Sequence, residues 1–281
     1  MKKKVILSSV SLIVLFIGIT AFYTSNSRGN DISNENTVAR NRKIVSKKRI
    51  DKRQAEKINN KFYDHKLIHQ EADMALVGYP STFSELVDSG ELTVDGEVTG
   101  LQDFVYENHP YTVASIFIES VLHGNNSQSN KTIRVMFMGG NITKKQMLAP
   151  VADKSFMNVS ADDLNSSEVV TVEYGNNRLP RAGDQIALVL DKAPSGANKI
   201  PGEFWSPKFA DKGTFFKNSN GQYKRTPEAK SVGGNSSKSA TISLDTIPSS
   251  NDQANGESQN EINRLDDEKM NSGMNRLINK K

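Results

Sequence analysis

The sequence predicts a mainly β protein, built as a small β-barrel or sandwich. Three observations support this. The stretch from Leu92 to Gly140 contains three strand-like runs separated by polar turns. Two further apolar runs of strand length follow, and the chain then offers an Asn-Gly turn between two short runs, which is the strongest short hairpin signal. Only one or two helix-like segments precede these strands.

Composition allows one folded domain within the 281 residues. Hydrophobic residues make up 36% of the chain, below the usual share for globular domains. The absence of cysteine excludes a disulfide framework, a cysteine-based zinc site and thiolate chemistry. We expect four regions: a signal-anchor or transmembrane segment at residues 1–24, a polar and basic linker at 25–51, a β-rich extracytoplasmic domain at 52–229, and a disordered tail at 230–281.

The first 24 residues read as an export segment. Three lysines precede 19 uncharged residues, from Val5 to Tyr23, which as a helix would extend about 28 Å, close to the thickness of a bilayer core. Two interpretations stay open, an uncleaved single-pass anchor and a cleaved signal peptide that leaves a secreted protein. In both, the charge distribution keeps the N-terminus in the cytoplasm and places the bulk of the chain outside it.

A basic run follows an Asn/Ser-rich spacer at residues 25–39. Between Arg40 and Lys57 the chain carries nine basic and two acidic residues. One interpretation is contact with an anionic surface, either lipid headgroups or phosphate-bearing wall polymers. The other is a solvated linker that leads into a helix. An extracytoplasmic address and the lack of interleaved aromatic residues argue against nucleic acid. The candidate contact residues are Lys47, Lys48, Arg49, Lys52 and Arg53.

Two helices are expected before the strands. From Lys52 to Met74 apolar residues and histidines recur at spacings of three and four, and Gly78 with Pro80 closes the segment. A short helix follows, in which Thr82 and Glu85 are spaced for a capping box, and residues 88–90 end it.

The three core strands have different patterns. Leu92–Thr99 alternates with a period of two, and Gly96 predicts a bulge or a close backbone approach, while Gly100 fits a barrel corner. Tyr111–Leu122 is apolar on both faces, as a central strand should be. Thr132–Met138 alternates again and Gly139-Gly140 ends it.

The remaining strands follow a long polar connection at residues 141–167. They are Val169–Tyr174, Gln185–Leu190 and the hairpin pair Thr214–Lys217 and Gln222–Lys224. Five aromatic residues lie in or beside this hairpin, and they suggest either a lid over one end of the core or a platform that stacks on a ligand. They are Phe204, Trp205, Phe209, Phe215 and Phe216.

The C-terminal region from about Lys230 is rich in Ser, Asn and Gly. It offers too little apolar surface to offset the entropy of ordering, so we expect disorder. Residues 258–279 predict a weak helix, interrupted by Gly273.

The block from Thr82 to Arg225 resembles a family of uncharacterised exported or membrane-anchored proteins of Gram-positive bacteria. The matching motifs include Val94-Asp95-Gly96-Glu97-Val98, Pro110-Tyr111-Thr112 and Gly183-Asp184 before an apolar strand. The pattern is also similar to the OB-like barrels of netrin and metalloproteinase-inhibitor modules, which implies an OB-like barrel here. The cysteines of those modules are missing, so no inhibitor activity is implied, and the resembled family brings no catalytic residues.

One pair of residues could carry metal chemistry. His65 and His69 are four residues apart on the expected helix, a spacing that can direct two imidazoles at one metal. Lys66 stands where a metalloprotease helix would carry its glutamate. The sequence contains no P-loop, no dinucleotide-binding glycine pattern and no nucleophile elbow.

We therefore expect a membrane-tethered extracytoplasmic binding or interaction module that is not an enzyme and holds no cofactor. The alternative is a metal-binding protein or metalloenzyme that uses His65 and His69.

Overall fold

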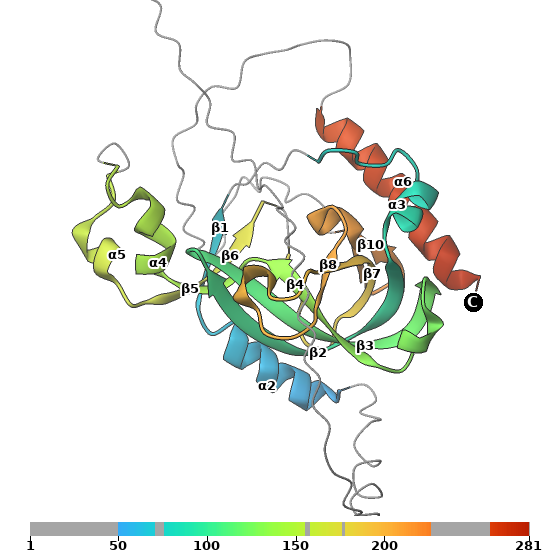
Figure 1. Cartoon of the computed structure of the whole chain (residues 1–281), viewed down its shortest axis with the longest axis horizontal. Helices are drawn as coiled ribbons and strands as arrows, with labels where there is room; N and C mark the ends of the chain where they lie inside the picture. Colours follow the sequence, from blue (N-terminus) through green and yellow to red (C-terminus); the bar gives the residue numbers. More distant parts are fainter. Residues whose placement is uncertain (1–49, 71–75, 155–157, 176–177, 226–258, 281) are drawn as a thin grey trace, which may run out of the picture. The chain divides into compact units, whose positions relative to one another are not determined.

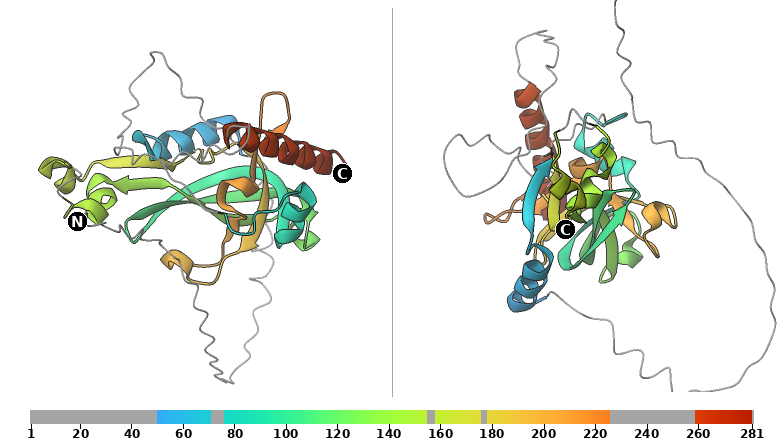
Figure 2. Two further views of the ribbon diagram at one scale, coloured as in Figure 1. Left: turned by 90° about the horizontal axis from the view of Figure 1, so that it is seen from above. Right: turned by 90° about the vertical axis from the view of Figure 1, so that its left-hand side faces the viewer.

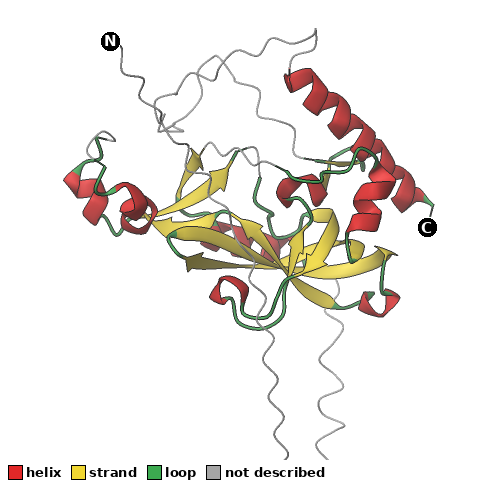
Figure 3. Cartoon of the chain, turned by 45° about the horizontal axis from the view of Figure 1, so that its top comes forward, coloured by secondary structure: helices red, strands yellow, loops and turns green. Residues whose placement is uncertain are grey.

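The structure is a computed structural model that describes residues 50–70, 76–154, 158–175, 178–225 and 259–280. This described part is mainly β with few helices, as the sequence predicts (Figure 3). None of its helices is long and apolar enough to cross a membrane. The expected anchor at residues 1–24, Lys47, Lys48 and Arg49 of the basic run, and residues 230–258 of the expected tail lie outside the described residues.

The elements follow one another along the chain as Figure 1 labels them. The helices are α2 (Lys52–Phe62), α3 (Phe83–Ser89), α4 (Lys144–Leu148), α5 (Ala161–Asn165) and α6 (Gln259–Asn279). The strands are β1 (Lys66–Gln70), β2 (Leu92–Tyr106), β3 (His109–His123), β4 (Thr132–Met138), β5 (Gly140–Thr143), β6 (Val169–Tyr174), β7 (Gln185–Lys192), β8 (Trp205–Pro207), β9 (Thr214–Lys217) and β10 (Tyr223–Lys224).

The larger of two sheets closes on itself. Its strand order is β10-β9-β7-β2-β3-β4-β8, and β8 pairs back onto β7. A ring of β7, β2, β3, β4 and β8 results, in which only the β4–β8 contact is parallel. β9 also pairs with β7, so among the described residues β9 and β10 extend this sheet beyond the ring.

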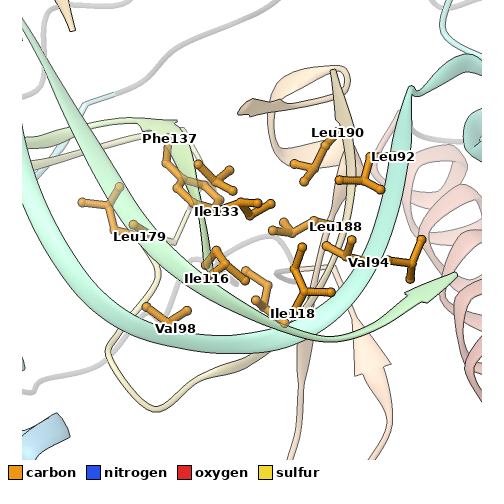
Figure 4. Packing of buried hydrophobic residues seen from close by; sticks show 14 residues of the cluster. Leu92, Val94, Val98, Ile116, Ile118, Ile133, Phe137, Leu179, Leu188 and Leu190 are labelled. Atoms are coloured by element: carbon orange, nitrogen blue, oxygen red, sulfur yellow. The ribbon is translucent and has the colours of Figure 1, made fainter. Parts of the chain in front are cut away.

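The main hydrophobic core fills the inside of this ring. Leu92, Val94 and Val98 point inward from β2, as their alternation predicts, and they meet side chains from β3, β4 and β7 (Figure 4). Thr93 and Glu97, expected to face solvent, are also buried. A second apolar cluster covers the outer face of the sheet near Thr93, whose partner on β7 is Val189. It joins β7, β9 and β10 to α3 and α6.

The second sheet has the order β1-β6-β5, so β6 does not belong to the single barrel that the sequence suggested. Its own small core contains Ile68, Ile142, Val170 and Val172. The chain passes from β4 into β5 through Gly139 and Gly140, whose φ angles are +100° and +145°. A side chain at either position would collide with a neighbouring strand, so two glycines are needed where the chain changes sheets.

The expected helix from Lys52 to Met74 is confirmed as far as Phe62 and is wrong at residues 66–70. Residues 66–70 are extended and pair in parallel with β6, with Lys66 opposite Val170. The helical spacing of the histidines therefore has no structural meaning. A partner strand about a hundred residues away outweighs the local pattern, and the local pattern gives no sign of that strand.

Local signals elsewhere are confirmed. Thr82 and Glu85 form the capping box of α3 in both directions. Glu107 and Asn108, with φ of +48° and +63°, make the two-residue turn between β2 and β3. The polar connection at 141–167 contains more structure than expected, since α4, α5 and most of β5 lie within it.

Residues 259–279 form the helix that the sequence predicts at residues 258–279, and this helix is part of the fold. They form α6, which lies outside the strands and beside α3 (Figure 2). Met270 and Met274 are completely buried, while Leu265 is exposed. The helical spacing of Met270, Met274 and Leu277 marks the face of α6 that packs against the rest of the fold.

Gly96 gives the first testable prediction. The pairing of β2 with β3 shifts register between Asp95 and Gly96, and a Cβ at Gly96 would lie 2.3 Å from the Phe117 carbonyl oxygen. We expect Gly96→Ala to lower the free energy of unfolding by about 1–3 kcal/mol. Urea unfolding followed by the fluorescence of Trp205, the only tryptophan, measures this change.

Gly100→Ala is the matched control on the same strand. A Cβ there would lie 3.5 Å from the Ser115 Cβ, an ordinary contact. Its effect should stay within about 0.5 kcal/mol. Equal losses for the two variants would contradict the close approach at Gly96.

Candidate anionic-surface site on helix α2

Helix α2 presents a cationic surface because only one side of it is buried. Asp51 caps its start by accepting a hydrogen bond from the Gln54 N–H at 2.7 Å. Ala55 and Phe62 face the barrel and are the only buried residues of the helix. The helix carries four basic residues and one acidic residue, Glu56. The positive charge is therefore left on the solvent side.

Two side chains fix α2 to the loop at residues 178–184. Asn59 pairs with the backbone of Ala182 in both directions, with its Nδ2 3.0 Å from the carbonyl oxygen and its Oδ1 2.8 Å from the amide nitrogen. Tyr63 donates from its hydroxyl to the Pro180 carbonyl at 2.8 Å. The orientation of the helix is thus set by specific polar contacts as well as by burial.

The C-terminal end of α2 is fixed by a buried amide. Asn141 donates to the Phe62 carbonyl at 2.9 Å and accepts from the Thr171 hydroxyl at 2.7 Å. A carbonyl in the last turn of a helix has no partner within the helix, so this bond satisfies it. It also ties α2 to β5 and β6 of the second sheet.

The 178–184 loop is rigidly held by ion pairing. Arg178 makes two hydrogen bonds to the Asp184 carboxylate, at 3.0 and 2.8 Å, and stacks 4.5 Å above the Phe216 ring. Asp184 also accepts from the backbone N–H of Arg181 at 2.8 Å. Gly183 and Asp184 in turn bond the backbone of Val98 on β2. The charge of Arg178 is therefore neutralised within the loop.

Arg181 differs from Arg178. Its guanidinium lies 4.5 Å above the Tyr63 ring and is exposed, and it forms no ion pair among the described residues. Burial raises the pKa of the Tyr63 hydroxyl above its ordinary value, although the neighbouring Arg181 acts in the opposite direction. Tyr63 is thus a neutral hydrogen-bond donor, and Arg181 provides a positive charge next to α2.

Two open hollows lie beside α2 and Arg181. One, of about 440 Å³, is lined by Asn59, Asn60, Tyr63, Asp64 and Arg181. The other, of about 670 Å³, is lined by residues of α2 and its cap: Asp51, Arg53, Gln54, Glu56, Lys57 and Asn60. Asn60 lines both hollows. We call the surface formed by Arg53, Lys57, Asn60 and Arg181 the α2 cationic face; the carboxylates of Asp51, Glu56 and Asp64 line the same hollows.

The sequence-predicted contact residues are only partly placed. Lys52 and Arg53 lie in the first turn of α2 and are exposed. The Lys52 ammonium is 4.0 Å from the Glu56 carboxylate, but the Lys52 side chain is 91% exposed, so this pair contributes little. Arg181 was not among the predicted residues. No local signal links a turn residue to a helix more than a hundred positions earlier.

The metal hypothesis loses its geometric basis. His65 precedes β1 and His69 lies within it, so the two imidazoles do not share a helical face. His69 Nδ1 is 3.6 Å from a Glu173 carboxylate oxygen, while the other oxygen of Glu173 accepts from the Leu179 N–H. Across the described ranges no three His, Asp or Glu side chains gather as a metal site would require.

The five aromatic residues of the hairpin region are distributed among three clusters. Phe204 packs with Val113 and Ile200, whereas Trp205 and Phe216 contact the core of the ring. Phe209 and Phe215 lie under α3 and α6. They form neither one lid nor one stacking platform; Phe215 and Phe216, for example, are successive residues of β9 and so point to opposite faces of the sheet.

Comparison with protein-family models, with curated proteins and with solved structures gave no match.

The docking of α2 gives a second prediction. We expect Asn59→Ala to destabilise the fold by about 1–3 kcal/mol, because the N–H and C=O of the buried Ala182 lose their partners. Urea unfolding measures this loss. Asn60→Ala is the control, since Asn60 is the next residue of α2 and is exposed. If both variants unfold like the parent, Asn59 does not fix the helix.

Proposed function

We propose that this protein is a membrane-tethered extracytoplasmic interaction module that acts by binding rather than by catalysis. Export and tethering rest on the charged start and the 19-residue apolar stretch of the sequence. They agree with the resemblance to exported proteins of Gram-positive bacteria. The proposal includes an uncleaved anchor with its N-terminus in the cytoplasm.

We also propose that the closed ring is an OB-like barrel. Numbered along the chain, its five strands neighbour one another in the order first, second, third, fifth, fourth and back to the first. The third and fifth strands are parallel and the other pairs antiparallel. This connectivity supports the assignment, because an OB-fold is a five-stranded Greek-key barrel. By analogy with that fold, the barrel would serve as a scaffold that presents binding surfaces on its outside.

The α2 cationic face is the observation that carries the binding proposal. Arg53 and Lys57 lie one turn apart on the exposed side of α2, and Arg181 extends the positive surface beyond the end of the helix. Such a surface, open and shallow, suits a layer of anionic groups better than it suits a small molecule. The basic residues Lys47, Lys48 and Arg49 precede it in the sequence.

We infer that the anionic groups are the lipid headgroups of the membrane that holds the anchor. Only 27 residues separate Tyr23 from Asp51, the cap of α2. A linker of this length can span up to about 90 Å, so it allows the cationic face to reach the headgroup layer, which attracts basic residues within a Debye length of about 8–10 Å. Phosphate-bearing wall polymers carry the same kind of anionic group, and competition with a soluble poly(glycerol phosphate) distinguishes them from lipid.

A third prediction tests the membrane contact in the full-length chain. The sequence has no cysteine, so Gln54→Cys offers one labelling site, beside the cationic face. With a donor dye there and an acceptor on the headgroups, energy transfer should be higher in vesicles containing 30% phosphatidylglycerol than in pure phosphatidylcholine vesicles. The neutralised variant Arg53→Gln/Lys57→Gln/Arg181→Gln should lose this difference. Three cations at about 1 kcal/mol each correspond to roughly 100-fold in surface binding.

A charge-matched variant is the control. Lys131, Lys217 and Lys224 are exposed and lie away from α2, so replacing these three lysines by glutamine should leave energy transfer unchanged. Equal transfer in both lipid compositions for the parent chain would reject the lipid contact. A loss of transfer in the parent upon addition of soluble poly(glycerol phosphate) would point to wall polymers as the preferred partner.

A further inference from the structure

A hollow separate from those beside α2 lies between α3 and α6. The two helices lie side by side outside the strands (Figure 1). The hollow measures about 410 Å³, which is in the size range of small-ligand sites. We call it the α3–α6 groove. It is lined by Thr82, Phe83, Ser84, Val87, Lys269, Gly273, Arg276, Leu277 and Lys280.

The floor of the groove is apolar. A Cβ at Gly273 would lie 2.2 Å from the Phe83 ring, so this ring packs directly against the backbone of α6. Phe83 and Leu277 are only partly buried, so each leaves apolar surface exposed beside the groove that it lines. Covering this surface with an aliphatic chain would remove it from water, which is favourable.

One wall of the groove is cationic. Lys269 and Arg276 of α6, and Lys280 just after it, are exposed and line the groove together. Their spacing around Gly273, of four, three and four residues, is that of one helical face. No ion pair joins Arg276 or Lys280 to another residue of the described chain, while Lys269 donates to the Ser81 carbonyl.

The described lining of the groove contains no carboxylate. In this it differs from the hollows beside α2, which Asp51, Glu56 and Asp64 help to line. Glu85 and Asp88, the acidic residues of α3, accept hydrogen bonds from that helix or its cap and do not line the groove. An anion in the groove would therefore meet three cationic side chains without a competing carboxylate in the lining.

The groove is preformed because α6 is held in place on its other side. Met270 and Met274 are completely buried in the cluster that includes β7, β9 and β10. Asn275 pairs with the backbone of Tyr223 in both directions, at 2.9 and 2.8 Å. These contacts fix α6 without help from a ligand, and most small-ligand sites are likewise largely preformed.

We propose that the α3–α6 groove binds a single-chain anionic amphiphile, whose head is a carboxylate or a phosphate. The aliphatic chain covers Phe83 and Leu277 on the floor. The head pairs with Arg276, since the planar fork of guanidinium N–H donors matches both kinds of anion. The volume suits such a small molecule rather than a helix of a partner protein. This site is separate from the α2 cationic face and does not depend on its lipid contact.

Photo-cross-linking of the full-length chain tests the proposal. The chain in neutral phosphatidylcholine vesicles is irradiated with dodecanoate that carries a diazirine in its aliphatic chain, and mass spectrometry locates the label. We expect label on the residues of α3 and α6 that line the groove. Excess unlabelled dodecanoate or dodecyl phosphate should reduce this labelling about tenfold or more, and the stronger competitor identifies the preferred head. Equal competition by dodecanol would show that the charge is not recognised and would contradict the proposal.

A pair of charge variants tests the cationic wall. Arg276→Gln/Lys280→Gln should lower labelling of the groove about tenfold, because the head loses its partners. Lys131→Gln/Lys154→Gln removes the same charge at exposed positions that do not line the groove and should leave labelling unchanged. The neutral vesicles contain no anionic headgroups, so neither result bears on the α2 contact.

A pair of size variants tests the hollow itself. Ser84→Phe places a ring in the groove from an exposed position of α3 and should prevent labelling. Ser272→Phe adds the same bulk at an exposed position of α6 that does not line the groove, and labelling should persist. Urea unfolding followed by Trp205 fluorescence verifies that both variants are folded. Equal labelling in all four variants would mean that the label comes from probe dissolved in the bilayer, and the proposal would fail.

Discussion

The pairing of β2 with strands on both of its sides is the interaction on which the rest of the structure depends. β2 pairs with β3 over nearly its whole length and with β7 over its first half. This register directs Leu92, Val94 and Val98 into the core of the ring. At Val98 the same strand bonds the backbone of Gly183 and Asp184, which positions the loop that holds α2. The pairing of β2 therefore positions both the core and the α2 cationic face.

Strand pairing within the ring satisfies the backbone N–H and C=O groups of only part of the barrel sheet. The ring closes only through the short strand β8, which pairs with β4 at one residue and with β7 at three, while β9 and β10 extend from the ring and would expose an edge. Helix α6 covers that extension with Met270 and Met274 and completes the edge backbone with Asn271 and Asn275. The C-terminal helix is thus a structural part of the β domain, although it is joined by a long connector.

Much of the fold could be predicted wherever one short segment carries the whole signal. The capping box of Thr82 and Glu85, the alternation along Leu92–Val98 and the Asn-Gly hairpin before β10 are of this kind. Features that depend on a distant partner were missed. β1 is extended because β6 pairs with it, and β8 contributes only three residues to the closure of the ring. In the candidate site, Lys52 and Arg53 were identified from local charge density, whereas Arg181 was not.

The sequence by itself determined the β-rich class, the position of most strands and the concentration of positive charge before and within α2. These properties follow from side-chain periodicity, turn residues and net charge, which act over a few neighbouring positions. Only the tertiary structure decided that the sheet closes through β8, that His65 and His69 do not share a helix face, and that α6 docks on β10. Each of these depends on backbone pairing or burial between segments far apart in the chain, where the free energy comes from a partner that local sequence does not reveal.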